Sequence, residues 1–285
     1  MNLVANGWTL IRDTLEAFIA DDALSHGASI AYYTLFSIAP VLLIVVAIAG
    51  LAFGREAAEG AIVAQLSALM GRDTAKALQA MVESASNPAT GTLATIVGLV
   101  AMMLAVTGVF GEVQSALNAI WKVQSREPVL SRLMLARLAS LGLVVTSGFL
   151  LTVSLAVSAG LAAVSTWLKV RYPAAAVVLH IADIAMSGLL IAGMFAAMYK
   201  VLPDTPIAWR DVAIGSVATT LLFEGGKYVI ALYIGQSNIA SSYGAAGALI
   251  VLLLWIYYSA QIFLLGAEFT RAFAKRYGSH APEPG

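Results

Sequence analysis

Residues 212–234 read VAIGSVATTLLFEGGKYVIALYI, an apolar run about as long as a helix needs to cross a bilayer. Two charged residues, Glu224 and Lys227, interrupt it near its middle. They lie three residues apart with the acid first, so both are on one helix face in the order that favours an ion pair. Charged side chains at this depth face protein or water rather than lipid. The stretch therefore predicts a transmembrane helix that packs against others around a polar interior.

The composition of the whole chain leads to the same class of protein. Of its 285 residues, 60% are hydrophobic and only 11% are charged, and the mean hydropathy is +0.86. A soluble domain would have about 25% charged residues. We therefore expect an all-α, polytopic membrane protein. The formal net charge of zero argues against a nucleic-acid partner, and the absence of cysteine excludes disulfides and thiolate metal sites.

Uncharged windows predict six transmembrane helices in a single membrane domain that covers residues 1–285. The expected spans are residues 29–53, 92–111, 139–165, 174–199, 212–234 and 245–267. Residues 55–91 are rich in charge and alanine, and we expect them to form short helices outside the membrane, with a break at Gly71. Before the first span, apolar residues recur at helical spacing, which predicts an N-terminal helix lying in the membrane interface. These residues are Trp8, Ile11, Leu15, Phe18 and Ile19.

The basic residues predict which side of the membrane each loop faces. With six spans, ten of the 16 Lys and Arg residues lie on the same side as the two ends of the chain. Cytoplasmic loops carry an excess of Lys and Arg. Both termini are therefore expected in the cytoplasm, and the helical segment at residues 55–91 is expected on the extracytoplasmic side.

Polar side chains of the first span are candidates for lining a cavity. Ser29, Tyr33 and Ser37 recur every four residues, and Pro40 follows them. A proline kinks or breaks a helix, and the carbonyls it frees are tolerated where water or polar side chains meet them. Accommodation of the proline by neighbouring helices would explain the pattern equally well.

The last span carries a second polar stripe. Tyr258 and Gln261 begin it, and it continues to Glu268, close to Arg271. Glu268 and Arg271 repeat the acid-then-base spacing at the membrane boundary, where a structural cap is the expected role.

The fourth span contains His180 and Asp183, three residues apart and so on one helix face. A His–Asp pair can relay protons or hold a ligand. Both residues lie within two turns of the start of the span, where hydration at the interface favours a merely structural role.

Several segments of the chain resemble the YihY/BrkB family of bacterial inner-membrane proteins. They are SIAYYTLFSIAP (29–40), ALNAIWKV (116–123), MYKVLPDT (198–205), LFEGGKYVIALYI (222–234) and YGAAGALIVLLLWIYYSAQIFLLGAEFT (243–270). The resemblance implies a six-helix inner-membrane fold, a virulence or serum-resistance label, and an old label as a ribonuclease. The ribonuclease label finds no support here, because the three histidines are far apart and no soluble basic domain is present.

These observations predict a translocator or exporter of a lipid, an amphiphile or a small solute, located as a multi-pass protein in the bacterial inner membrane. Its cavity would lie between the first, fifth and last spans. The lining residues would be Ser29, Tyr33, Ser37, Pro40, Glu224, Lys227, Tyr258 and Gln261. The alternative is an envelope scaffold or regulatory membrane protein that transports nothing. We expect no enzyme activity, cofactor or metal; the partners would be the lipid bilayer and the substrate, and a homo-oligomer is left open.

Overall fold

The computed structural model describes residues 3–70, 72–86, 108–123, 160, 173–236 and 245–280, and every regular element among them is a helix. This agrees with the predicted all-α class. Four of the described helices are long and apolar enough to cross a membrane.

Helix α1 (Leu3–Ala20) contains the expected N-terminal helix, and a tight turn at Asp21 and Asp22 joins it to α2. Its apolar residues do not all pack inward. The exposed members are Trp8, Ile11, Leu15 and Ile19. An apolar face left open beside a membrane span suits a helix that lies in the interface.

Helix α2 (Ala23–Phe53) runs without interruption through Pro40. The sequence left open whether this proline kinks or breaks the helix, and the structure contains no break. Proline removes one backbone donor and disturbs one carbonyl, whereas ending the helix would leave many more backbone groups unpaired in lipid. At 1.5 Å per residue the 31 residues extend about 46 Å, more than the ~30 Å of the hydrocarbon layer.

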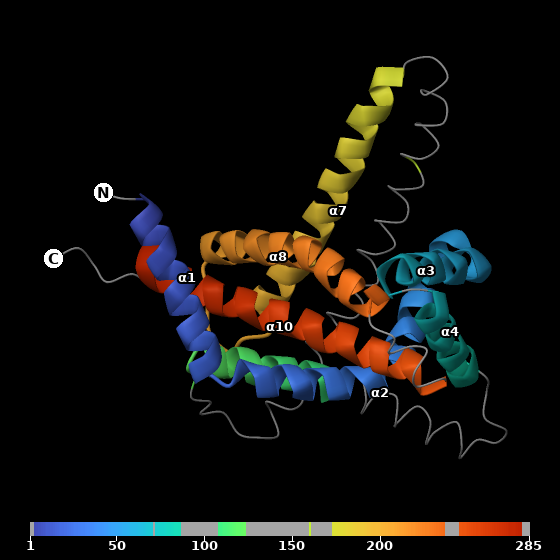
Figure 1. Ribbon diagram of the computed structural model, residues 1–285, viewed down its shortest axis with the longest axis horizontal. Helices are drawn as coiled ribbons and strands as arrows, with labels where there is room; N and C mark the ends of the chain where they lie inside the picture. The colour runs from blue at the N-terminus through green and yellow to red at the C-terminus, as the bar shows by residue number, and fades with distance from the viewer. Residues whose placement is uncertain are drawn as a thin grey trace.

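Helices α3 (Arg55–Met70) and α4 (Arg72–Ser86) form the pair expected in the segment 55–91. Gly54, with φ of 84°, ends α2 and redirects the chain into α3. The two helices pack on each other and on α2, at the end of α2 that lies away from α1 (Figure 1). Their shared interior includes Leu78 and Val82.

Helix α7 (Pro173–Val201) packs on α8 (Trp209–Gln236), which in turn packs on α10 (Ala245–Tyr277). The later part of α7 joins this group, whereas its beginning projects away from the other described helices (Figure 1). Residues 108–120 are helical as well.

Helix α10 is the central element, because it packs against α1, α2 and α8 and lies between α2 and α8 (Figure 1). Aromatic side chains fill the space where α7, α8 and α10 meet. Phe195 and Tyr199 come from α7, Phe223 from α8, and Trp255 and Phe263 from α10. The rings of Phe223 and Trp255 are stacked, with their centroids 6.0 Å apart.

The four candidate spans are Ala23–Leu51, Ile184–Val201, Trp209–Ile234 and Ala246–Tyr277. They coincide with four of the six predicted spans, although α7 qualifies only from Ile184 onward. Most of the predicted span 92–111 and all but one residue of the span 139–165 lie outside the described residues. The number of six spans and the cytoplasmic position of both termini therefore stay predictions.

Candidate functional site

A cavity of about 450 Å³ lies between the middle of α8 and the middle of α10. Its α8 wall consists of Leu221, Leu222, Gly225, Gly226 and Val229, and its α10 wall of Tyr258, Gln261, Ile262 and Leu265. Phe18 of α1 closes one side. The volume is within the range of sites for small molecules, about 300–1,000 Å³. The described lining residues are apolar apart from one phenol and one amide.

Two adjacent glycines of α8 create this space. Gly225 has nothing within 4 Å of the place where a Cβ would stand, so it leaves the cavity open. Gly226 is buried, and a Cβ there would be 2.6 Å from Ile262 Cδ1 and would press on the Tyr258 hydroxyl. The second glycine therefore lets α10 approach α8, and the first keeps room beside the contact.

Gln261 connects the cavity with α2. It packs against Gly27, and its Nε2 donates to the carbonyl oxygen of Leu24 over 3.4 Å. Its Oε1 is buried and has no hydrogen-bond partner within the part of the chain that the structure describes. One buried acceptor beside the cavity therefore lacks a donor among the described residues.

Glu224 and Lys227 form an ion pair on α8, with Lys227 Nζ 2.8 Å from a carboxylate oxygen. Their side chains are 37% and 25% exposed, and neither lines the cavity, which is formed by other residues of the same helix. The pair neutralises itself within one helix turn, so the charges need no partner from another helix.

The predicted polar stripe of α2 does not reach the same cavity, because α10 lies between α2 and α8 (Figure 1). Ser29 is partly exposed, and Tyr33 is exposed and lies next to Gly108. Ser37 is buried and donates to the carbonyl oxygen of Thr34 at 3.3 Å, while Pro40 is partly exposed within α2. Of the predicted lining residues, the structure brings Tyr258 and Gln261 to the α8–α10 cavity.

Glu268 and Arg271 belong to a charged network that the sequence did not reveal. Arg271 Nη1 is 3.7 Å from a Glu268 carboxylate oxygen and 3.2 Å from Asp21 Oδ2. Asp21 also pairs with Lys122. Three segments far apart in sequence therefore meet at one end of α10, and the predicted cap joins α10 to the turn after α1 rather than standing alone.

Helix 108–120 and the residues that follow it supply further polar contacts at this end. Asn118 Nδ2 donates to Asp204 Oδ2 at 2.8 Å, and the backbone N–H of Asp204 donates back to Asn118 Oδ1 at 2.9 Å. His26 Nδ1 is 3.3 Å from a carboxylate oxygen of Glu112. Two of the segments that carried the family resemblance, ALNAIWKV and MYKVLPDT, thus touch each other through Asn118 and Asp204.

His180 and Asp183 both lie on α7, in the part whose side chains the structure does not describe. Among the described residues, no three His, Asp or Glu side chains lie together as ligands of a metal ion would.

The chain was compared with known protein families and with solved structures. The sequence profile of the family described as "Virulence factor BrkB" matches residues 14–285. No solved structure matches the chain.

Curated bacterial proteins named "UPF0761 membrane protein" are similar to this chain. The protein of Alkalilimnicola ehrlichii is 27% identical over 270 residues, which cover 91% of this chain and 57% of that protein. The protein of Verminephrobacter eiseniae is 30% identical over 270 residues, which cover 92% of this chain and 62% of that protein. The YihY protein of Salmonella typhimurium is 32% identical over 178 residues, 62% of this chain and 58% of that protein. The chain therefore spans about three fifths of the length of these relatives.

Proposed function

Because the chain belongs to the BrkB family of membrane proteins, we propose that it moves a lipid or another amphiphile across a membrane through the cavity between α8 and α10. The chemistry of the cavity wall is the observation that carries this proposal. Long apolar side chains suit a hydrocarbon tail, and the Tyr258 hydroxyl with the Gln261 amide suits one polar group.

The same wall argues against a hydrated ion as the substrate. No charged residue is among the described residues that line the cavity. An ion that leaves water needs oxygen ligands or an opposite charge to replace its hydration shell. Glu224 and Lys227 could have supplied charge, but they face away from the cavity and already pair with each other. An amphiphile requires only the mixed surface that is present.

We also propose that the protein is a multi-pass protein of the bacterial inner membrane and not an enzyme. The four apolar helices and the membrane-protein names of bacterial relatives support the location. The described residues of the cavity wall include no nucleophile beside a base, which favours a transport role over catalysis.

Filling the cavity tests the proposal. In Gly225→Leu, the new Cβ would have no neighbour within 4 Å and the side chain would extend into the cavity, so we expect the helix to keep its fold. The matched control is Gly193→Leu on α7, another glycine with nothing within 4 Å. Purified protein would be reconstituted in vesicles with a fluorescent phospholipid, and the loss of fluorescence to an external quencher would report movement between leaflets.

We expect the wild type and Gly193→Leu to move the lipid, and Gly225→Leu to fall to the rate of vesicles without protein. Equal rates for Gly225→Leu and the wild type would remove the α8–α10 cavity from the pathway. If the wild type moved no amphiphile faster than empty vesicles, the scaffold alternative would replace transport.

A further inference from the structure

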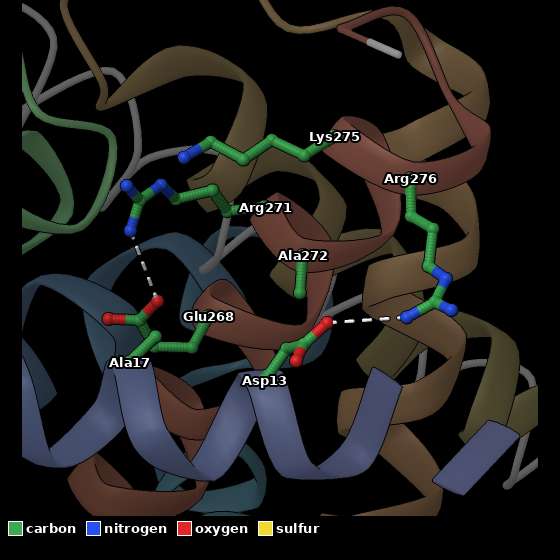
Figure 2. A pocket seen from close by; sticks show the side chains of 7 residues that line it. All are labelled: Asp13, Ala17, Glu268, Arg271, Ala272, Lys275 and Arg276. Atoms are coloured by element: carbon green, nitrogen blue, oxygen red, sulfur yellow. Dashed lines mark hydrogen bonds and ion pairs between the residues drawn. The ribbon is translucent and has the colours of Figure 1, made fainter. Parts of the chain in front are cut away.

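A second cavity, also of about 450 Å³, lies between α1 and the last turns of α10 (Figure 2). It is separate from the α8–α10 cavity and shares no lining residue with it. Its charged residues are Asp13, Glu268, Arg271, Lys275 and Arg276. Three cations and two carboxylates therefore surround one open space.

Glu268 is the unusual member of this group. Its side chain is completely buried, and neither carboxylate oxygen has an N–H donor within hydrogen-bond distance in the described part of the chain, while the Asp21 carboxylate interacts with it as a second negative group. The nearest cation, Arg271, is 3.7 Å away, which is beyond hydrogen-bond range, and Arg271 is closer to Asp21 at 3.2 Å. A buried carboxylate without donors is costly, so a donor that enters the cavity would be stabilised there.

The cations of the cavity differ in whether they already form an ion pair within the protein. Arg276 Nη1 is 3.3 Å from Asp13 Oδ2. Figure 2 draws this ion pair as a dashed line. Lys275 is exposed, and no hydrogen bond or ion pair of its ammonium group occurs among the residues that the structure describes. Lys275 and the part of Arg271 that faces the cavity are therefore the groups that can receive an anion, and phosphate oxygens are strong acceptors for both side-chain types.

A ligand of this cavity has to offer a negative group to the cations and a donor to the Glu268 carboxylate. A simple anion would leave the Glu268 carboxylate without a hydrogen-bond donor, and a simple cation would face Arg271, Lys275 and Arg276. We infer that the α1–α10 cavity binds a phosphate ester whose alcohol part carries an ammonium donor. Phosphoethanolamine represents this class, with its phosphate at Lys275 and Arg271 and its ammonium at Glu268. The group can come from a phospholipid headgroup or from a soluble phosphate ester.

The test uses the full chain in phosphatidylcholine nanodiscs, with phosphoethanolamine and phosphocholine as probes in a calorimetric or NMR titration. Phosphocholine has the same charges but no N–H donor, so comparing the two measures the contribution of Glu268. The variants are Lys275→Gln and Glu268→Gln. The control is Arg12→Gln, because Arg12 is an exposed cation of α1 that pairs with Glu16 and does not line the cavity.

We expect phosphoethanolamine to bind more tightly than phosphocholine, Lys275→Gln to weaken both by about tenfold, and Arg12→Gln to change neither. Glu268→Gln should abolish the preference between the two probes. Absence of binding to the folded wild type, equal affinity for both probes, or unchanged affinity in Lys275→Gln would overturn the inference.

A second arm separates the two sources of the ligand. When the nanodiscs contain phosphatidylethanolamine, a lipid headgroup in the cavity would compete with the soluble probe and raise its apparent dissociation constant. An unchanged constant would assign the cavity to a soluble ester. The inference does not depend on transport. The titrations measure binding in the α1–α10 cavity, whereas the Gly225→Leu assay measures lipid movement through the α8–α10 cavity.

Discussion

At the scale of single residues, two glycines set how closely α8 and α10 approach. Gly266 of α10 faces Thr219 of α8, and Gly215 of α8 faces Thr270 of α10. Thr219 Oγ1 is 3.0 Å from the Tyr199 hydroxyl, which donates to the carbonyl oxygen of Phe263 at 2.7 Å. The small residues thus make room for a buried hydrogen-bond chain that joins three helices, as small residues do at many interfaces in membranes.

We predict that Gly266→Ala lowers the free energy of unfolding by about 1–3 kcal/mol, because its Cβ would overlap Thr219 Oγ1 and lie 2.6 Å from the Tyr199 hydroxyl oxygen. Unfolding in detergent, followed by circular dichroism, would measure the change. Gly193→Ala has open space and should be neutral or slightly stabilising. Adding Thr219→Ala to Gly266→Ala should recover part of the loss, and a single variant as stable as the wild type would show that the contact is not tight.

At the scale of elements, the segment 108–123 links parts of the chain that are distant in sequence. It contacts the turn after α1 through Lys122 and the start of α2 through Glu112. It also holds the connection between α7 and α8, where Gln114 Nε2 and Asn118 Nδ2 donate to the two carboxylate oxygens of Asp204, at 2.9 and 2.8 Å. Val113, Ala116, Leu117 and Ile120 of the same segment are buried in the hydrophobic core, so apolar packing and polar contacts together fix it.

Asn118→Ala should cost about 1–3 kcal/mol of stability, since it removes the donor to Asp204 Oδ2 and the acceptor of the Asp204 backbone N–H, whereas Gln114 still donates to Oδ1. Gln114→Ala removes one bond in an exposed position and should cost clearly less. Both losses would be read from the midpoint of unfolding in a detergent titration. Equal effects of the two substitutions would mean that the reciprocal Asn118–Asp204 pair has no special role.

The sequence predicted elements better than it predicted their partners. Long uncharged windows identified α2, α7, α8 and α10, because hydropathy reports length and environment along one helix. Tyr258 and Gln261, which the sequence predicted to line a cavity between the first, fifth and last spans, lie in the α10 wall of the α8–α10 cavity. Residue spacing could not show that α10 separates α2 from α8 in the folded protein. Because of this separation, Ser29, Tyr33 and Ser37 lie away from the α8–α10 cavity.

The polar contacts between distant parts of the chain were equally hard to predict from the sequence. Arg271 and Asp21 are 250 positions apart, and Asp204 and Asn118 are 86 apart. Periodicity describes the face of a helix but not which distant residue meets that face. The Glu268–Arg271 spacing was visible in the sequence, whereas the Asp21 and Lys122 contacts depend on the packing of whole helices.

At the scale of the whole molecule, α1 and the end of α10 lie at one end of the bundle, and α3 and α4 lie at the other (Figure 1). Helix α2 connects these ends and is long enough to cross the hydrocarbon layer. The arrangement suits a chain whose α1 and α3 are on opposite sides of a membrane.

The matched variants Gly7→Cys and Gly60→Cys would test this placement in a protein that has no other cysteine. Each glycine has nothing within 4 Å of its Cβ direction, so neither change should disturb packing. If α1 is cytoplasmic, a membrane-impermeant maleimide should label Gly60→Cys in intact cells and Gly7→Cys only after the inner membrane is opened. Labelling of both variants from the same side would contradict the expected topology.

The central position of α10 has a consequence for biosynthesis. The ribosome completes α2 and α8 before α10, yet α10 lies between them in the finished bundle. Helices α2 and α8 therefore cannot reach their final packing until α10 arrives, and until then Asp21 and Tyr199 lack the partners that residues 271 and 263 provide. Assembly of this part of the bundle is consequently a late event of translation, in which the arriving helix completes polar contacts that the nascent chain has left open.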